Sequence, residues 1–356
     1  MNTKKRILIA PLNWGLGHAT RCIPIINALL KNNFEVIISA NGRSHNLLKK
    51  EFPLLEFINI KGIEVKYHKF LPMSFNIILQ TPKILYAIYS ENIAIKKIIK
   101  KYKIDGIISD NRFGLFNKNV KSVFITHQLQ IQSRYLKNII QKMNYFFINK
   151  FNICWIIDDS KKNLAGDLSK PKKLPINYKY IGLQSRLSLS KKQKKYKLCF
   201  IISGPEPQRT IFEEIIIKST KKIKEKTIII LGKPEEEKNI IKKRNITIIS
   251  SVDTKEINKY ILESEIIISR SGYSTIMDLE KTQSKAIFVP TPGQTEQEYL
   301  ARYLKKKKIA DYQIQDKFDL NKGLDNYKNY SGFISANNHD TNWEKLFNLF
   351  KNKRKS

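Results

Sequence analysis

The sequence contains few cysteines and no long uninterrupted apolar run. Its three cysteines, Cys22, Cys154 and Cys199, lie far apart without the spacing of metal ligands. Each lies in or beside an apolar stretch, which predicts buried thiols in a reducing compartment. No segment offers about 18 consecutive apolar residues, so we expect no membrane-spanning helix. A short apolar run near the start, without a small-residue cleavage site, does not predict a signal peptide.

Acidic residues are also scarce. Lysine and arginine number 65 against 31 acids, which gives a net charge of +34. Such a charge suits nucleic acid, an anionic membrane surface or an anionic substrate. No nucleic-acid motif is present and the lysines are spread through both halves, so we expect no nucleic-acid partner. A general compositional bias towards Lys, Ile and Asn is the alternative explanation.

The order of apolar and helical segments predicts an α/β protein. Its 356 residues suffice for two domains. Strands alternating with helices predict a doubly wound parallel sheet in each half of the chain. The predicted strands of the first half are 6–10, 35–39, 104–109, 121–126 and 153–157, the last closing the first sheet. Those of the second half are 197–203, 227–231, 246–249, 266–268 and 286–289.

These elements suggest domain boundaries. We predict an amino-terminal domain at 1–175, a linker at 176–196 and a carboxyl-terminal domain at 197–330. The tail, 331–356, contains a predicted helix from about 342 to 350 that packs back across the domains.

Two neighbouring strand-to-helix loops in the second half have the residues of a nucleotide-sugar site. The run 269–278, Ser-Arg-Ser-Gly-Tyr-Ser-Thr-Ile-Met-Asp, ends a strand with a glycine turn and begins a helix. Such a helix start favours a phosphate group. The loop at 290–298, Pro-Thr-Pro-Gly-Gln-Thr-Glu-Gln-Glu, supplies amides and carboxylates that suit sugar hydroxyls. Two ordinary turns with polar helix starts are the alternative interpretation.

A second glycine loop follows the first predicted strand. The run 13–21 reads Asn-Trp-Gly-Leu-Gly-His-Ala-Thr-Arg, and we predict a helix from about His18 to Lys31. His18 is the best candidate for a general base, since an imidazole titrates near neutrality. A structural or helix-capping histidine is the alternative. The ends of two further strands, at Asp110 and His127, are expected near the same site.

The two motifs resemble those of GT-B glycosyltransferases of family 28, and within it the peptidoglycan N-acetylglucosaminyltransferases. The resemblance covers most of the chain and is strongest at 13–21 and 269–301. It implies two Rossmann-like domains that face a cleft, the first binding an acceptor and the second a nucleotide-sugar. It also implies a metal-independent, inverting hexosyltransferase without a cofactor.

The resemblance assigns roles to residues. The catalytic base is His18. On the acceptor side it implies Gly15, Gly17, Asp110, Asn111 and His127. For the donor it implies phosphate contacts, a ribose contact at Asp278 and contacts from Gln297 and Glu298 to the sugar. The full donor-binding set is Arg186, Ser203, Gly204, Arg270, Ser271, Gly272, Ser274, Thr275, Asp278, Gln297 and Glu298.

Two positions depart from the family pattern. The family has a pair of amides where this chain has Gln297 and Glu298, and a His-Glu pair where it has His127 and Gln128. The donor sugar and the pathway therefore stay open. Asp110 could replace the missing carboxylate, although an Asp at a strand end is as often a turn residue.

The partners follow from the same resemblance. We expect a UDP-sugar donor, a lipid-linked or glycan acceptor, and a cytoplasmic protein peripheral on the inner face of the cell membrane. The apolar stretch 70–89 and the lysine-rich helix after it suit an anionic bilayer surface, or else a core helix with a solvated face. A nucleotide-sugar epimerase of the same fold and a non-catalytic basic binding protein are the alternative functions.

Overall fold

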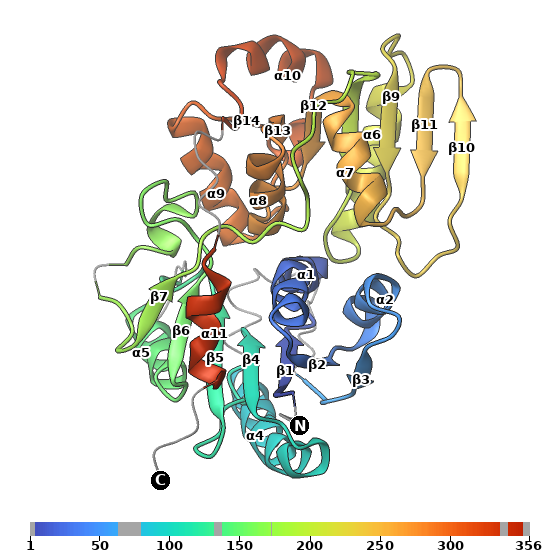
Figure 1. Ribbon diagram of the computed structural model, residues 1–356. Helices are drawn as coiled ribbons and strands as arrows, with labels where there is room; N and C mark the ends of the chain where they lie inside the picture. The colour runs from blue at the N-terminus through green and yellow to red at the C-terminus, as the bar shows by residue number, and fades with distance from the viewer. Residues whose placement is uncertain (1–3, 63–79, 132–136, 172, 335–340, 352–356) are drawn as a thin grey trace. The chain divides into compact units, whose positions relative to one another are not determined.

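The computed structural model describes residues 4–62, 80–131, 137–171, 173–334 and 341–351. The chain divides into two compact units, residues 1–184 with 339–356, and residues 185–338. Each unit contains one sheet with helices around it (Figure 1).

The first unit contains a seven-stranded sheet in the order β3-β2-β1-β4-β5-β6-β7, with every pair parallel. Its elements are β1 (Arg6–Pro11), α1 (Leu16–Lys31), β2 (Glu35–Ser39), α2 (Gly42–Glu51), β3 (Glu56–Ile58), α4 (Thr81–Tyr102), β4 (Gly106–Asp110), β5 (Lys121–Thr126), α5 (Lys137–Ile148), β6 (Ile153–Ile156), the short helix η1 (Gly166–Leu168), β7 (Tyr178–Tyr180) and α11 (Trp343–Lys351).

The second unit contains another seven-stranded sheet, in the order β10-β11-β9-β8-β12-β13-β14. Only the edge pair β10–β11 is antiparallel. Its elements are β8 (Tyr196–Ile201), α6 (Gln208–Thr220), β9 (Thr227–Ile230), β10 (Ile240–Lys243), β11 (Ile246–Ile249), α7 (Thr254–Leu262), β12 (Ser264–Ser269), α8 (Tyr273–Lys281), β13 (Lys285–Phe288), α9 (Thr295–Lys306), β14 (Asp311–Tyr312), η2 (Gln315–Lys317), α10 (Leu320–Asn326) and η3 (Tyr327–Asn329).

The central strands are buried on both faces because helices cover each side of a parallel sheet. In β1, residues 7–10 are fully buried, and in β12 the same holds for residues 266–268. Continuous Ile-rich runs therefore form the two cores, which explains why the sequence predicts these strands well.

The sequence analysis was wrong about the last strand of the first sheet. The sheet does not end at β6, because β7 pairs with β6 in parallel through Cys154 and Tyr178. This strand has only three residues, Tyr-Lys-Tyr, none of them fully buried. A short and half-exposed edge strand lacks the apolar run on which the prediction depended.

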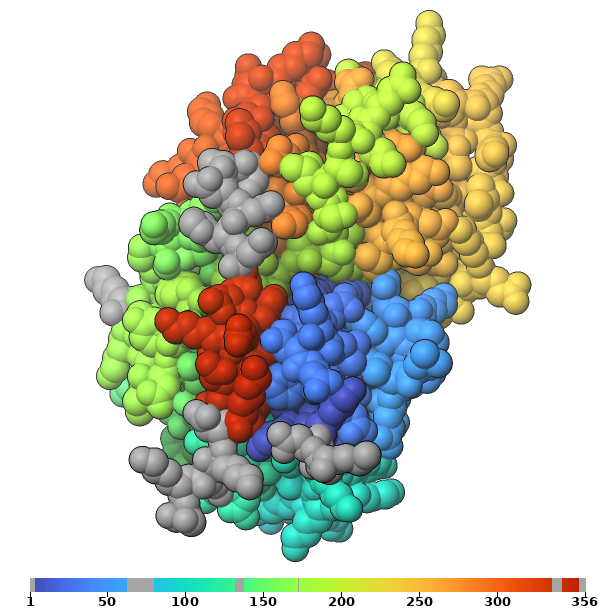
Figure 2. Space-filling model, viewed as in Figure 1, coloured from blue at the N-terminus to red at the C-terminus, as the bar shows by residue number. Residues whose placement is uncertain are grey.

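The carboxyl-terminal helix α11 completes the core of the first unit. Phe347 and Phe350 contact Phe34 edge-on, with ring centroids 5.5 and 6.3 Å apart, and both lie near Trp155. Figure 2 shows this helix, in red, lying directly against the blue amino-terminal residues of the same unit. A β-carbon on Gly106 would lie 2.5 Å from the Phe350 ring, so the strand needs glycine there.

Candidate active site

Each sheet has one point at which its strand order reverses direction, and the candidate residues gather at both points. In the first sheet the reversal falls between β1 and β4, where Pro11 pairs with Asp110. In the second it falls between β8 and β12, where Ile201 pairs with Ser269. Loops that leave the carboxyl ends of such strand pairs form the ligand crevice of open α/β sheets.

At the first reversal, the loop after β1 brings His18 beside Asp110. Gly15 precedes α1 with φ of 81°, a left-handed conformation that favours glycine. The helix begins at Leu16, two residues earlier than predicted, so Gly17 and His18 lie in its first turn. His18 Nδ1 lies 3.1 Å from Asp110 Oδ1, and Asp110 is fully buried.

Arg21 connects this pair to a second histidine. It lies one turn after His18 on α1 and is 2% exposed. Its Nε donates to Asp110 Oδ2 at 2.7 Å, and its Nη2 forms a short ion pair with Asp110 Oδ1. Its Nη1 lies 2.9 Å from Nδ1 of His127, which is also buried. The predicted base His18 and two predicted acceptor-side residues, Asp110 and His127, therefore meet in one cluster.

The charges of the cluster shift its pKa values. Burial raises the pKa of Asp110, but Arg21 and His18 outweigh this and hold it well below its usual range. Burial, and then the charge of Arg21, lower the pKa of His18 despite the opposing effect of Asp110. At neutral pH the site therefore contains a carboxylate beside a neutral imidazole, the form in which a histidine can accept a proton.

Arg21 belongs to the glycine-loop motif, but the sequence analysis assigned it no role. One signal was available: Arg21 directly precedes the apolar run 22–26 of α1, and an arginine buried beside such a run is nearly always paired. Its partner could not be found, because Asp110 is 89 residues away.

The other acceptor-side residues shape the loops. Asn111 follows Asp110 with φ of 55°, a conformation in which asparagine is enriched. The backbone N–H of Asn111 donates to the Ile125 carbonyl on the neighbouring strand at 3.2 Å. At the family's His-Glu position, the backbone N–H of Gln128 donates to Thr126 Oγ1 at 3.0 Å.

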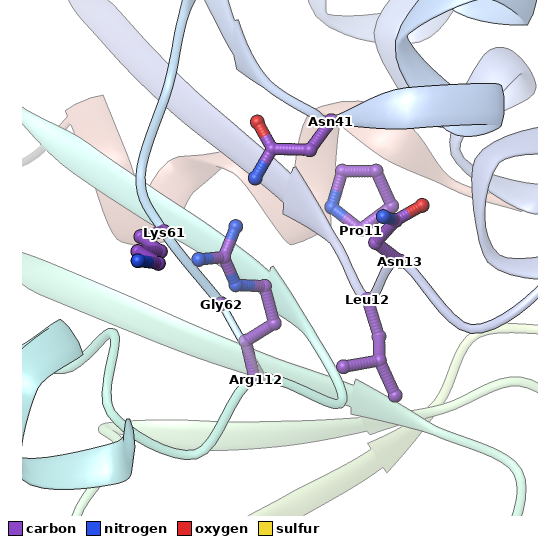
Figure 3. Close-up of a pocket in the computed structure, with 7 residues that line it drawn as sticks. All are labelled: Pro11, Leu12, Asn13, Asn41, Lys61, Gly62 and Arg112. Carbon is purple, nitrogen blue, oxygen red and sulfur yellow. The ribbon is translucent and has the colours of Figure 1, made fainter. Parts of the chain in front are cut away.

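A small cavity opens at the same edge of the first sheet (Figure 3). Its volume is about 30 Å³, and polar side chains dominate its lining, which consists of Pro11, Leu12, Asn13, Asn41, Lys61, Gly62 and Arg112. Arg112 is held by Glu91 through Nε at 2.9 Å and by Ile60 O through Nη2 at 2.9 Å. These polar residues have room between them for about one water-sized group. Among them, only Asn13 belongs to a motif of the sequence analysis.

At the second reversal, the start of α8 is open. Gly272 is the N-cap with φ of −71°, and a β-carbon there would meet no atom within 4 Å. Neither the backbone angle nor the packing of the described residues explains a glycine at this position. A ligand that approaches the backbone would explain it, because helix starts of this kind favour phosphate. Ser274 and Thr275 lie in the first turn of the same helix.

Asp278 lies in the second turn of α8 and is hydrogen-bonded to the segment before β8. Its Oδ1 accepts a hydrogen bond from Ser185 Oγ at 2.5 Å. Burial raises its pKa to about 6, although Arg186 and Ser185 oppose the shift. Arg186 donates through Nη1 to Thr254 Oγ1 at 3.1 Å, while its buried Nε has no hydrogen-bond partner among the described residues.

Arg270 has a structural role. It is 1% exposed, and its guanidinium donates to the backbone carbonyls of Val289, Pro290 and Gln208 and to the side chain of Gln315. The group also lies 4.1 Å above the centre of the Phe212 ring. These contacts hold the loops after β8, β12 and β13 together and occupy the donors with which Arg270 could bind a ligand.

The remaining donor-side residues lie in adjoining loops. Ser203 and Gly204 follow β8, and Gly204 has φ of 122°. Ser271 Oγ donates to the carbonyl of Gln297 at 2.8 Å, which ties the start of α8 to α9. The Oε1 atom of Gln297 accepts from Thr291 N, and that of Glu298 from Gly293 N, each at 2.9 Å. Both side chains therefore order the loop before α9.

Within the described part of the chain, no group of three His, Cys, Asp or Glu residues is arranged to hold a metal ion. All three cysteines are buried and free, as predicted.

Both halves of the chain match glycosyltransferase families. Residues 198–342 match the glycosyltransferase family 28 C-terminal domain, and residues 5–149 match glycosyl transferase family 1. A curated relative from Buchnera aphidicola subsp. Schizaphis graminum is 26% identical over 318 residues, covering 84% of this chain and 81% of its own. It is the UDP-N-acetylglucosamine--N-acetylmuramyl-(pentapeptide) pyrophosphoryl-undecaprenol N-acetylglucosamine transferase.

Solved structures share the fold at low sequence identity. Acinetobacter baumannii MurG has a TM-score of 0.55 and 15% identity, covering 98% of this chain and 99% of its own. The spinosyn rhamnosyltransferase SpnG has a TM-score of 0.64 and 10% identity, covering 97% and 95%. The two family matches and the shared fold of two largely parallel α/β sheets show that the chain is a GT-B glycosyltransferase, whose carboxyl-terminal part is of the family 28 type and which is distantly similar to MurG.

Proposed function

We propose that this glycosyltransferase moves a hexose or N-acetylhexosamine from a UDP-sugar to a hydroxyl of a membrane-associated glycolipid. The observation that carries the proposal is the His18–Asp110 pair at the strand reversal of the first sheet. A neutral imidazole beside a buried carboxylate is the arrangement required to take a proton from an attacking hydroxyl.

The proposed reaction is a direct displacement. The acceptor oxygen attacks the anomeric carbon, the bond to the nucleoside diphosphate breaks, and the acceptor proton passes to His18 Nε2. At that step the neutral His18 must carry its single proton on Nδ1, from which it donates a hydrogen bond to Asp110 Oδ1. Attack opposite the leaving group inverts the anomeric carbon.

The second unit supplies the donor site in this proposal. The start of α8 at Gly272, the loop at Ser203 and Gly204, and Arg186 offset the charge of the departing diphosphate without a metal ion. Asp278 accepts the ribose hydroxyls, and Gln297 and Glu298 contact the sugar. Arg270 is left out of the direct contacts, because its donors are occupied within the unit.

A glycolipid acceptor is supported by the surface of α4 and α5. The outer side of α4 exposes Leu85, Tyr86, Tyr89 and Ile93, and α5 exposes Ile139 and Phe146. Leu85 and Phe146 line one apolar hollow together with Lys142. Apolar side chains flanked by lysines suit the surface of an anionic bilayer.

We therefore place the protein at the cytoplasmic face of the membrane. No helix in the described ranges is long and apolar enough to cross a bilayer. The predicted apolar stretch 70–89 contributes here only through its second part, since residues 63–79 lie outside the described residues.

The decisive experiment is a binding screen followed by product analysis. Thermal shift with UDP-, GDP- and dTDP-sugars should show stabilisation by UDP-sugars, and incubation with lipid extract should transfer the labelled sugar to the lipid fraction. No stabilisation by any nucleotide-sugar would reject the proposal. Free epimerised sugar formed without acceptor would instead identify an epimerase.

A further inference from the structure

One side chain organises the charged cluster of the first unit. The terminal nitrogens of Arg21 each approach a different imidazole at the same ring atom: Nη2 lies 2.9 Å from His18 Nδ1, and Nη1 lies 2.9 Å from His127 Nδ1. Its Nε and Nη2 also donate hydrogen bonds to the two carboxylate oxygens of Asp110. The guanidinium therefore contacts groups from α1, from the end of β4 and from the residue after β5.

The chemistry of the guanidinium limits what these nitrogens can be. Arginine has only donors and stays charged, so a ring nitrogen 2.9 Å away must act as an acceptor. A neutral imidazole that accepts at Nδ1 carries its proton on Nε2. At His18, Asp110 Oδ1 lies 3.1 Å from the same Nδ1 and favours the opposite tautomer. Arg21 and Asp110 thus compete over where the proton of His18 is held.

The shorter contact belongs to Arg21, and its Nη2 has two hydrogens, which can serve Asp110 and His18 together. We propose that Arg21 is a positioning residue that holds His18 and His127 in their Nε2–H tautomers at rest. His18 becomes a base only when its Nδ1 turns from Arg21 to Asp110. In that exchange one water takes the Nε2 proton and another water supplies a proton at Nδ1, so the charge of His18 is unchanged.

The consequence for catalysis rests on the proposed function, whereas the tautomer assignment does not. Burial and Arg21 lower the pKa of His18, as expected for an imidazole that faces a guanidinium. The charged and titratable groups around it are Arg21 on its own helix, Asp110 from β4 and His127 from beyond β5. Loss of the Arg21 contact should therefore leave Asp110 to determine the His18 tautomer.

The test is nitrogen NMR of the full-length protein labelled with ¹⁵N-histidine. The chain has five histidines, so His18→Gln and His127→Gln assign the two signals. We expect unprotonated Nδ1 and protonated Nε2 for both residues at neutral pH. Arg21→Lys keeps a cation for Asp110 but has one amine in place of three nitrogens. In this variant His18 should change to the Nδ1–H tautomer, with a titration midpoint at higher pH.

Arg112→Lys is the matched control. Arg112 is another buried arginine of the same unit; it pairs with Glu91 and contacts no imidazole among the residues that the structure describes. The Arg112→Lys variant should leave the ¹⁵N signals of His18 and His127 at their wild-type positions. The inference is overturned if His18 or His127 is in the Nδ1–H form in the wild type, or if folded Arg21→Lys keeps the wild-type His18 tautomer. If the tautomers are as expected but no sugar is transferred, the proposed function fails and the Arg21 assignment stands.

Discussion

The strand reversals of the two sheets occupy equivalent places, yet their contents differ. The first contains a buried network of ionisable side chains, His18, Arg21, Asp110 and His127. The second contains an open helix start at Gly272 and a half-buried Asp278 beside Ser185. The first therefore suits proton transfer, which needs fixed charges, and the second suits binding of an anion by backbone groups. The same topology supports two kinds of chemistry because loops, and not strands, carry the reactive groups.

The largest expected effect comes from replacing His18, the proposed base of the first unit. His18→Gln should lower turnover by about 10²- to 10⁴-fold, the usual contribution of a general base. Binding of UDP should be unchanged, because the donor residues belong to the second unit. Transfer kinetics and calorimetry with UDP measure the two effects separately. Full turnover in this variant would remove His18 as the base.

The next largest effect concerns the buried ion pair. Asp110→Asn leaves the Arg21 guanidinium buried without its countercharge and should destabilise the protein by about 3–5 kcal/mol. Glu91→Gln is the control, since it breaks the other buried pair of the unit, with Arg112, at similar burial. Urea unfolding should show comparable losses for both. Only Asp110→Asn should change the titration of His18. Equal effects of the two variants on that titration would contradict a specific role of Asp110 beside His18.

A smaller effect should come from the acidic residue of the second unit. Asp278→Asn should weaken UDP binding by about 1.5–3 kcal/mol, as expected for hydrogen bonds to a charged group. The pKa of Asp278 is raised to about 6, so the ionised form that accepts ribose hydroxyls is lost as the pH falls through 6. UDP affinity of the wild type should fall below that pH more steeply than affinity of the variant. Parallel profiles would reject the ribose contact.

The raised pKa of Asp278 has a second consequence, for stability. The folded state binds this proton more tightly than the unfolded chain, whose carboxyl has its ordinary pKa of 3.8. The group's contribution to stability is therefore present below about pH 4 and is lost as the pH rises through about 6. Asp278→Asn should remove that part of the pH dependence in unfolding measurements.

The smallest effect on stability is expected at Gly272. Gly272→Ala should change the free energy of unfolding by less than about 1 kcal/mol, since its backbone angles suit alanine and no atom obstructs the methyl group. UDP affinity should nevertheless fall, because the methyl group occupies the space before the helix start. Gly232→Ala is the contrasting control: its φ is 65° and the methyl carbon would lie 2.3 Å from Ile202 O, so it should unfold readily. Unchanged UDP affinity in Gly272→Ala would show that nothing binds close to this glycine.

The sequence analysis predicted strands with a long apolar run better than short strands. The strands at 35–39 and 121–126 were predicted with the bounds that the structure has, because each is a buried apolar run flanked by polar residues. The edge strands β3, β7, β10 and β14 were missed, being two to four residues long and largely exposed or polar. Edge strands lack the apolar run that identifies a strand in a sequence.

By itself, the sequence determined the class of fold, the two glycine loops and the residue types at each loop, since these depend on patterns within about twenty neighbouring residues. Tertiary structure alone decided which of those side chains meet. Arg21 lies 89 residues from Asp110 and 106 from His127, and Ser185 lies 93 from Asp278. The tertiary structure also showed that hydrogen bonds from Arg270 hold the neighbouring loops of its own unit together. The physical reason is that burial and charge pairing, which set the chemistry of these groups, arise only when strands distant in sequence become neighbours in a sheet.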